Sequence, residues 1–404
     1  MVLDEDVRAQ RKKKVKKEPA QHYTIAPGER TGSTVDLQEA EGHARSPKDR
    51  RIGRHVFGIP FFRAEAPSVF RRHCAEDCRV GALFTRHSVL RISPSSTRDA
   101  RYSVDRSRFW AILIGIDAYK HSRLRGCVSD ALSIKRFFTD DLGVPEGHIQ
   151  CLLGPNNPTP GDPKLTPTPS RANIVDMLYS LVHNPEIDQN DNIIIYYAGH
   201  GSIYRCPEHP HAVRCRSGLC PTEALCPLDR DTQDADGKWI PDISDREINT
   251  LFKHISLAKG NKITFIADCC YARSFSRQDQ DSVRSTHPTS HASLDDMLCA
   301  ADERWKQSGD PNYQSVLSKD WQPDMSSRVV LAACKDNQSA KEEQGHNGFH
   351  GVFTRTLVRV LRSIDYKKGT TYIDLVHLVN QSISQTPVVA GVHKSERLWY
   401  TKPR

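Results

Sequence analysis

The chain has 404 residues and a mass of 45.6 kDa, enough for one sizeable α/β domain with extra segments or for two domains. Hydrophobic residues make up 37% and charged residues 26%, and no run of about eighteen apolar residues occurs, so we expect no membrane span. The first six residues, MVLDED, carry no apolar signal core, which argues against secretion and favours a cytoplasmic or nuclear protein.

The net charge of +8 is concentrated at the N-terminal end. Residues 1–108 hold 23 Lys and Arg against 14 Asp and Glu, whereas the remainder holds 34 against 35. The basic run 11–17, RKKKVKK, would suit a nuclear-import signal or a nucleic-acid contact, but a solvated tail is the commoner origin of such a run. We therefore expect no nucleic-acid partner for the main domain.

Residues 1–105 are expected to form a basic, largely disordered, prodomain-like extension, because they are rich in Arg, Ser and Pro and lack periodicity. Cys74 and Cys78 have a metal-like spacing, but no second close pair accompanies them. In a chain without a signal peptide, the twelve cysteines are expected to remain reduced.

Strands and helices are expected to alternate from residue 106 to residue 404, which predicts a mostly parallel sheet with helices on both faces. Two polar stretches interrupt the pattern: an excursion over 203–242, and a segment over 273–326 that we interpret as a mobile insertion. The expected strands are 109–116, 149–153, 193–198, 262–270, 328–334 and 398–400, and the expected helices are at about 131–138, from 170, 244–258, 353–364 and 372–383.

The strand over 193–198 ends in Gly199-His200-Gly201. Its six residues show no alternation of polar and apolar side chains, which is typical of a strand buried on both faces. The flanking glycines leave His200 at the carboxyl edge of the sheet, where open α/β sheets bind their ligands. The alternative is a structural histidine in a strand-to-loop turn.

A second strand favours the catalytic interpretation, because it ends in Asp268-Cys269-Cys270 and is followed by a polar loop. His200 and Cys270 should emerge at the same edge of one parallel sheet, where an imidazole can deprotonate a thiol and later protonate a leaving amine. We expect His200 to be the general base and acid and Cys270 the nucleophile. The amides of Gly201 and Cys270 are the candidate oxyanion donors.

These two strand ends resemble the motifs of caspases and metacaspases, Tyr197-Ala198-Gly199-His200-Gly201 matching one motif and Asp268-Cys269-Cys270 the other. The resemblance extends from Phe109 to the C-terminus and is greatest to the caspase-like domains of fungal metacaspase relatives. It implies a caspase-like three-layer α/β/α sandwich with a mostly parallel, six-stranded central sheet over residues 106–404. It also assigns the nucleophile to Cys270 rather than Cys269.

Substrate preference follows from the resemblance and from charge. Asp130 and Asp268 match the positions that form an acidic pocket in metacaspases, which implies cleavage after Arg or Lys. Asp130 as a helix N-cap is the alternative. The resemblance implies peptide substrates, no required organic cofactor and, by family association only, a link to apoptosis. We expect a monomer.

Three features depart from the motifs or extend them. Residues 271–273, Tyr-Ala-Arg, replace the usual His-Ser-Gly after the nucleophile. Asp229 and Asp245 match two calcium ligands of metacaspases, but Arg246 stands where a third is expected, so the sequence predicts a weak or absent calcium site. A structural zinc and unpaired loop thiols remain alternatives for the cysteines of the polar excursion, which are Cys206, Cys215, Cys220 and Cys226, near His209 and His211.

The segment over 273–326 lies where the family carries the linker between its large and small subunit segments. It contains four basic residues that are candidate self-cleavage sites of a zymogen, with ordinary solvated charge as the alternative: Arg277, Arg284, Arg304 and Lys306. The leading hypothesis is a metacaspase-like cysteine endopeptidase that processes itself. The rival is a catalytically impaired caspase-like pseudoenzyme acting as an interaction or signalling module, which the Tyr-Ala-Arg replacement favours.

Overall fold

The computed structural model describes residues 105–158, 167–205, 221–270, 283–308, 313–335, 338–346, 348–365, 369–380 and 385–400. All of them belong to one compact unit, Val56–Arg404. The predictions for the basic extension, Cys74, Cys78 and residues 271–273 lie outside the described residues. None of the helices in the described part of the chain has the length and hydropathy of a membrane span.

A six-stranded sheet forms the centre of the domain, in the order β11-β8-β7-β3-β1-β2. Five strands are parallel, and β11 pairs antiparallel with β8 at one edge. The bounds are β1 Phe109–Ile116, β2 Ile149–Gly154, β3 Asn192–Ala198, β7 Ile263–Asp268, β8 Arg328–Ala332 and β11 Val388–Ala390. Every residue of β1, β3 and β7 is buried, as their continuous apolar sequences predict.

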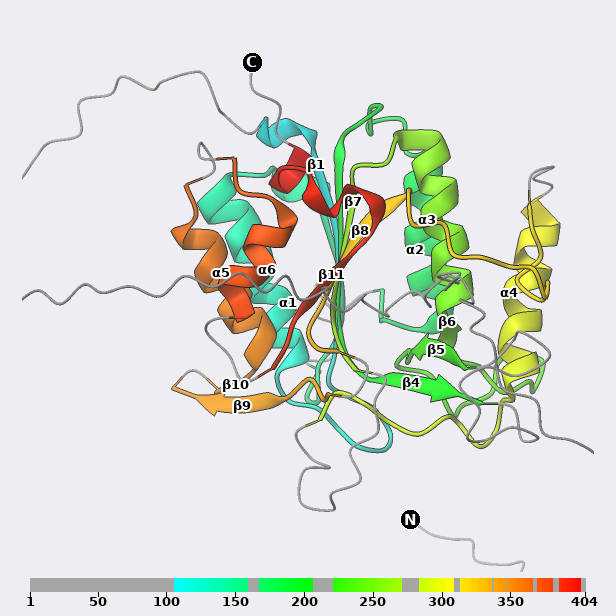
Figure 1. Ribbon diagram of the computed structural model, residues 1–404. Coiled ribbons are helices and arrows are strands. Elements are labelled where there is room, and N and C mark those ends of the chain that lie inside the picture. Colours follow the sequence, from blue (N-terminus) through cyan, green and yellow to red (C-terminus); the bar gives the residue numbers. More distant parts are fainter. Residues whose placement is uncertain are drawn as a thin grey trace, which may run out of the picture. The chain divides into compact units, whose positions relative to one another are not determined.

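Helices cover both faces of the sheet, which Figure 1 shows nearly edge-on. One face carries α1 (Cys127–Arg136), α5 (Val352–Ser363) and α6 (Tyr372–Asn380), and the other carries α2 (Arg171–His183) and α3 (Asp245–Lys259), with α4 (Leu294–Ser308) packed outside α3. The predicted α/β class and mostly parallel six-stranded sheet are therefore confirmed.

Local sequence accounts for where α2 and α3 begin. The hydroxyl of Ser170 accepts a hydrogen bond from the amide of Asn173, and that of Ser244 accepts one from the amide of Glu247. Each serine thus satisfies a backbone donor that the first helical turn leaves unpaired. A partly buried ion pair of 2.7 Å between Arg171 Nη2 and Glu247 Oε2 then joins the two helices near these ends.

Two smaller sheets lie at the carboxyl edge of the central sheet. The first joins β4 (Gly201–Tyr204), β5 (Thr222–Leu225) and β6 (Ile243–Ser244), and the second is the antiparallel pair β9 (Glu342–Gly345) and β10 (Gly348–Gly351). The sequence predicted none of these five strands, because each is only two to four residues long. They matter for function because β4 starts immediately after His200.

The predicted strand over Leu398–Tyr400 is wrong. These residues form a 3₁₀ turn with positive φ at Trp399 (57°) and Tyr400 (49°), and the sixth strand is β11. Trp399 is buried with its ring edge-on to that of Phe109, at 5.9 Å between centroids. Three apolar residues can fill a core gap in either conformation, so pattern alone misleads at this length.

Residues 273–326, interpreted from the sequence as a mobile insertion, contain the packed helix α4. Its side chains at Leu298, Ala301 and Trp305 are buried, and together with Leu294 they follow helical spacing. That periodicity is present in the sequence, but the surrounding charged residues obscured it. The insertion therefore contains a packed helix just after the segment that reaches the candidate site.

Candidate functional site

His200 and Cys270 lie at the same edge of the central sheet. Strands β3 and β7 are parallel neighbours, with Ala198 opposite Asp268 at their ends. Each residue of the pair comes two positions after its strand end, and both side chains are almost fully buried. The strand ends that the sequence singled out are therefore adjacent in the fold.

The hydrogen bonds of His200 define its tautomer. Nε2 lies 2.5 Å from the main-chain oxygen of Ser122, which can only accept, so Nε2 carries the proton. Nδ1 is buried and has no hydrogen-bond partner among the described residues, which leaves its lone pair free. Burial lowers the pKa of His200 to about 4, although the bond to Ser122 opposes the shift. The imidazole is thus neutral near pH 7 and able to accept a proton at Nδ1.

The thiol of Cys270 has polar neighbours from three segments. Burial alone would disfavour the thiolate, but side-chain hydrogen bonds from Cys334 and Ser285 and a main-chain bond from Ala340 lower the pKa of Cys270. Cys334 follows β8 and was not predicted to take part in the site. A thiol with a lowered pKa and a neutral imidazole at neighbouring strand ends are the two groups that nucleophilic catalysis requires.

The segment Val283–Thr286 lies across this pair as an extended peptide. Its main chain pairs on one side with Ala340 and Lys341, and on the other side with Gly201. The oxygen of Arg284 accepts hydrogen bonds from the amides of Gly201 and Cys270, both at 3.1 Å. The two amides predicted to form an oxyanion hole therefore converge on a single carbonyl oxygen of the same chain.

The side chain of Arg284 is fully buried against three carboxylates, which we call the acidic cluster: Asp130, Asp268 and Glu342. The guanidinium lies 2.5 Å from Asp130 Oδ2, 2.8 Å from Asp268 Oδ2 and 3.1 Å from Glu342 Oε1. Burial raises the pKa of Asp130 to about 7 and the charge of Asp268 adds to the rise, although the Arg284 guanidinium opposes it. The surroundings of Arg284 are thus suited to a buried cation.

The supports of the acidic cluster come from distant parts of the chain. Asp130 Oδ2 also accepts a hydrogen bond from the amide of Gly351, and Asp268 Oδ2 accepts one from the hydroxyl of Thr354. A β-carbon at Gly351 would lie 2.5 Å from Asp268 Oδ2, so only glycine fits there. Asp130 lies in the first turn of α1 and does not cap it, since the N-cap residue is Gly126.

Glu342 belongs to the acidic cluster although no sequence motif marks it. It is the first residue of β9, and its carboxylate also accepts hydrogen bonds from the amides of Arg125 and Gly126. Nothing in the local sequence marks it, because its neighbour Glu343 is also acidic and points to the surface. Only the return of the β9–β10 pair toward α1 brings it into the cluster.

The other predicted cleavage sites lie elsewhere. Arg304 and Lys306 are on α4, where they pair with Asp176 and Asp302 and remain partly or largely exposed. Arg277 lies outside the described residues. Among the described candidates, Arg284 alone has its carbonyl between the two amides.

The predicted calcium ligands are not brought together with a third ligand in the described residues. Among these residues, Asp117, Cys127 and Glu342 make the one set of three ligand atoms lying within 4.8 Å of one another. Asp229 Oδ1 accepts a hydrogen bond from the amide of Arg171, and burial raises the pKa of Asp245 to about 7. The guanidinium of Arg246 donates to the carbonyl of Val316. The calcium expectation stays a prediction.

Zinc binding in the polar excursion also stays a prediction. Cys226 is buried, and its thiol lies 3.5 Å from Asp242 Oδ2. The remaining zinc candidates, Cys206, Cys215, Cys220, His209 and His211, lie outside the described residues.

Comparisons with known proteins find metacaspases among the proteins similar to this chain. The chain is 27% identical to Metacaspase-1 of Saccharomyces cerevisiae over 173 residues, which cover 43% of this chain and 35% of that protein. It is 25% identical to Metacaspase-9 of Arabidopsis thaliana over 185 residues, covering 45% and 49%, and 30% identical to Metacaspase-1 of Eremothecium gossypii over 165 residues, covering 41% and 32%. The matched segments span less than half the length of each relative.

The family itself follows from a broader match. A model of the caspase domain, that of peptidase family C14, matches residues 108–401, which include both strand ends, the acidic cluster and the segment that carries Arg284. The chain therefore belongs to the caspase domain family, a family of cysteine peptidases.

Proposed function

We propose that the protein is a cysteine endopeptidase that cleaves after Arg or Lys and that its first substrate is its own Arg284–Ser285 bond. The observation that carries this proposal is the double anchoring of Arg284. Its carbonyl oxygen lies between the amides of Gly201 and Cys270 while its guanidinium pairs with the acidic cluster. A peptide bound in this way presents its carbonyl carbon for attack by a nearby nucleophile.

The reaction would proceed by acyl transfer. Nδ1 of His200 takes the proton of the Cys270 thiol, and the sulfur attacks the carbonyl carbon of Arg284. The oxyanion that forms is stabilised by the two amides, which already donate to the ground-state oxygen. The imidazolium then protonates the amine of Ser285 as the peptide bond breaks. Water hydrolyses the thioester and restores the thiol.

The preference for Arg or Lys rests on the charge of the acidic cluster. Three buried carboxylates without a cation would repel one another and lack solvation, so the cluster favours a substrate side chain that brings a positive charge. After self-cleavage, removal of Arg284 would expose the cluster to an incoming peptide. No organic cofactor enters any step.

The pseudoenzyme remains the second candidate, and the burial of Arg284 favours it. A residue held by three ion pairs and fully shielded from solvent keeps the site closed in the intact chain. An intact chain that never cleaves itself would act only by binding partners. Cleavage of the Arg284–Ser285 bond by the protein itself would support the endopeptidase, and its absence would support the pseudoenzyme.

The test uses the full chain as wild type and as the variants Cys270→Ala, His200→Ala, Arg284→Gln, Arg284→Lys and Arg304→Gln, each incubated with and without calcium. Fragments are identified by mass and by N-terminal sequencing. We expect fragments that begin at Ser285 in wild type, Arg284→Lys and the exposed-site control Arg304→Gln, and none in the other three. The cleaved protein should also hydrolyse an Arg-ending fluorogenic peptide.

Two results would count against the endopeptidase. Equal cleavage in Cys270→Ala would mean that another protease makes the cut. An intact wild-type chain in every condition, in protein verified as folded, would favour the pseudoenzyme.

A further inference from the structure

The peptide that lies across the site continues beyond Ser285, and its next residues are held through their main chain. The amide of Thr286 donates to the oxygen of Gly201 at 2.9 Å. The oxygen of His287 accepts from Arg230 Nη2 at 2.9 Å, and the amide of Thr289 donates to the hydroxyl of Tyr204 at 3.2 Å. These contacts fall on the second, third and fifth residues after the Arg284–Ser285 bond.

Arg230 and Tyr204 are held in position by a buried carboxylate, that of Asp242. Arg230 forms two parallel bonds to it, Nε to Oδ1 at 3.0 Å and Nη2 to Oδ2 at 2.9 Å, and the hydroxyl of Tyr204 donates to Oδ2 at 2.9 Å. All three side chains are less than 10% exposed. The pairing leaves one Nη2 proton and one hydroxyl lone pair directed at the peptide. No step of the proposed acyl transfer uses this network.

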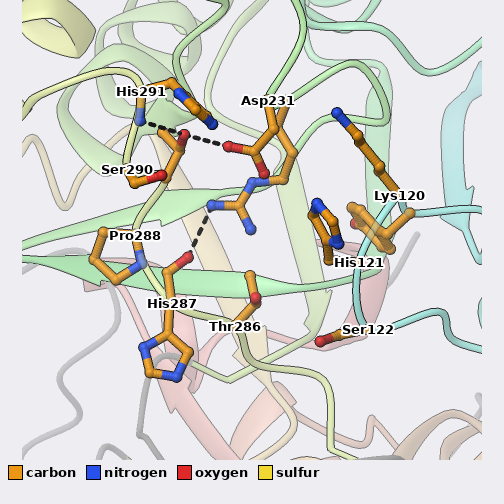
Figure 2. A pocket seen from close by; sticks show the side chains of 12 residues that line it. Lys120, His121, Ser122, Asp231, Thr286, His287, Pro288, Ser290 and His291 are labelled. Atoms are coloured by element: carbon orange, nitrogen blue, oxygen red, sulfur yellow. Dashed lines mark hydrogen bonds between the residues drawn. The ribbon is translucent and has the colours of Figure 1, made fainter.

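Two side chains of the segment after Ser285 make further contacts with residues near Arg230. The hydroxyl of Thr289 donates to Asp231, and the ring of His291 stacks on Trp239 at 3.9 Å between centroids and 16° between planes. The segment forms one wall of a cavity of about 340 Å³, and residues 119–122 form part of the opposite wall. Figure 2 shows this cavity with Lys120, His121 and Ser122 facing the segment. Ser122 is also the partner of His200, so the cavity adjoins the candidate base.

We propose that Tyr204, Arg230, Asp231 and Trp239 form a leaving-side subsite that binds the residues following the cleaved bond in any substrate. The inference rests on the proposed function and deepens it. Arg230 and Tyr204 form hydrogen bonds only with main-chain groups of the segment. The subsite should therefore select an extended backbone and tolerate different side chains at these positions. Asp231 should favour a hydroxyl or a positive charge on the fifth residue after the cleaved bond. Trp239 should favour an aromatic ring on the seventh residue.

The subsite predicts that substrate length after the cleaved bond determines efficiency. Three peptides share one sequence ending in Val-Arg. The first continues as a fluorogenic amide alone, the second as Ser-Thr, and the third as Ser-Thr-His-Pro-Thr-Ser-His. We expect self-cleaved wild-type enzyme to show a higher kcat/KM for the third peptide than for the second.

The variants Tyr204→Phe and Arg230→Lys should each lower kcat/KM for the third peptide by about three- to tenfold, the usual effect of losing one hydrogen bond. Their turnover of the fluorogenic amide should match wild type, which also reports that each variant is folded. Trp239→Ala, at a side chain that is 38% exposed, should lower kcat/KM for the third peptide and leave that for the second unchanged. Arg362→Lys, at an exposed pair with Asp141, serves as the control.

The outcomes separate the two proposals. No turnover of any peptide by the self-cleaved enzyme would count against the proposed function. Turnover of the fluorogenic amide with equal kcat/KM for the second and third peptides would overturn the subsite alone. Equal losses on the short and long substrates in Tyr204→Phe and Arg230→Lys would also overturn it, since a merely structural role produces that pattern.

Discussion

The main-chain oxygen of Arg284 lies 3.1 Å from the amide nitrogen of Cys270, and the guanidinium of the same arginine lies 2.8 Å from Asp268, two residues before that cysteine. One strand end, that of β7, therefore contacts both ends of the bound residue. The distance from the acidic cluster to the candidate nucleophile is thereby set by the backbone of residues 268–270. Only a long, cationic side chain can reach the cluster while its carbonyl remains between the two amides.

Removal of Arg284 should destabilise the intact chain. Arg284→Gln leaves three buried carboxylates without a counter-charge, and breaking a buried ion pair in this way costs about 3–5 kcal/mol. We expect a loss of that size in the free energy of unfolding, measured by denaturant titration in a Cys270→Ala background that prevents self-cleavage. The control Arg362→Gln, which breaks an exposed pair, should cost less than about 1 kcal/mol. Similar losses in the two variants would contradict the buried cluster.

Glu342 should contribute to substrate recognition, unlike its neighbour in sequence. A hydrogen bond to a charged group contributes about 1.5–3 kcal/mol, so Glu342→Gln should lower kcat/KM for an Arg-ending peptide by about ten- to a hundredfold. Glu343→Gln changes the same chemical group one residue later, where the side chain is half exposed, and should leave kcat/KM unchanged. Equal effects of the two substitutions on kcat/KM would mean that Glu342 does not contribute to substrate recognition.

The sequence predicted the residues that end the buried strands and missed those that arrive through tertiary folding. Continuous apolar runs predicted β3 and β7, and a parallel sheet then required His200 and Cys270 to share an edge. Glu342 and Cys334 reach the site only because separate segments return to that edge. No local pattern encodes such a return, so pattern analysis has no means of finding them.

Arg284 was identified from the sequence, but its special position was not. Charge placed it among four candidate cleavage sites but could not rank them, because each was a basic residue in or beside a polar insertion. The distinction lies in backbone hydrogen bonds from Gly201, Cys270 and Ala340. These bonds depend on how the segment before α4 packs, and α4 itself was hidden by its charged residues.

The pH dependence of kcat should report His200. A base must be neutral to accept the thiol proton, and burial lowers the pKa of His200 to about 4. We therefore expect kcat for an Arg-ending peptide to fall only as pH drops toward about 4, well below the pKa near 6.5 of an exposed histidine. The profile is measured at saturating substrate after self-cleavage. An acid limb near 6.5 would mean that His200 is solvated in the working enzyme.

The pH dependence of KM should report Asp130 instead. Its carboxyl group must be ionised to pair with a substrate cation, and burial raises its pKa to about 7 even with Arg284 in place. Loss of Arg284 removes a charge that lowers this pKa, so it should rise further in the free enzyme. We expect KM to increase as pH falls through this higher pKa, above about 7, while kcat stays constant over the same range. In Asp130→Asn the KM should be higher and nearly independent of pH over the same range, and an unchanged pH dependence would assign the effect to another group.

Asp245 should make the stability of the fold depend on pH and should reveal any calcium binding. Burial raises its pKa to about 7, above the value near 3.9 expected in the unfolded chain. Between those values the folded state holds a proton that the unfolded state has lost, so stability due to this group falls as pH rises toward 7. Asp245→Asn removes that loss and should raise the melting temperature at pH 8 but not at pH 4.

Calcium bound at Asp245 would stabilise the carboxylate and would raise the wild-type melting temperature at pH 8 but not that of Asp245→Asn. Because Arg246 adjoins the site, we expect millimolar calcium to have little effect on either protein. Both are compared by thermal unfolding in a Cys270→Ala background, with the exposed substitution Asp236→Asn as the control for charge alone. A rise of several degrees with calcium that disappears in both Asp245→Asn and Asp229→Asn, but persists in Asp236→Asn, would show that the two carboxylates bind the ion despite the arginine.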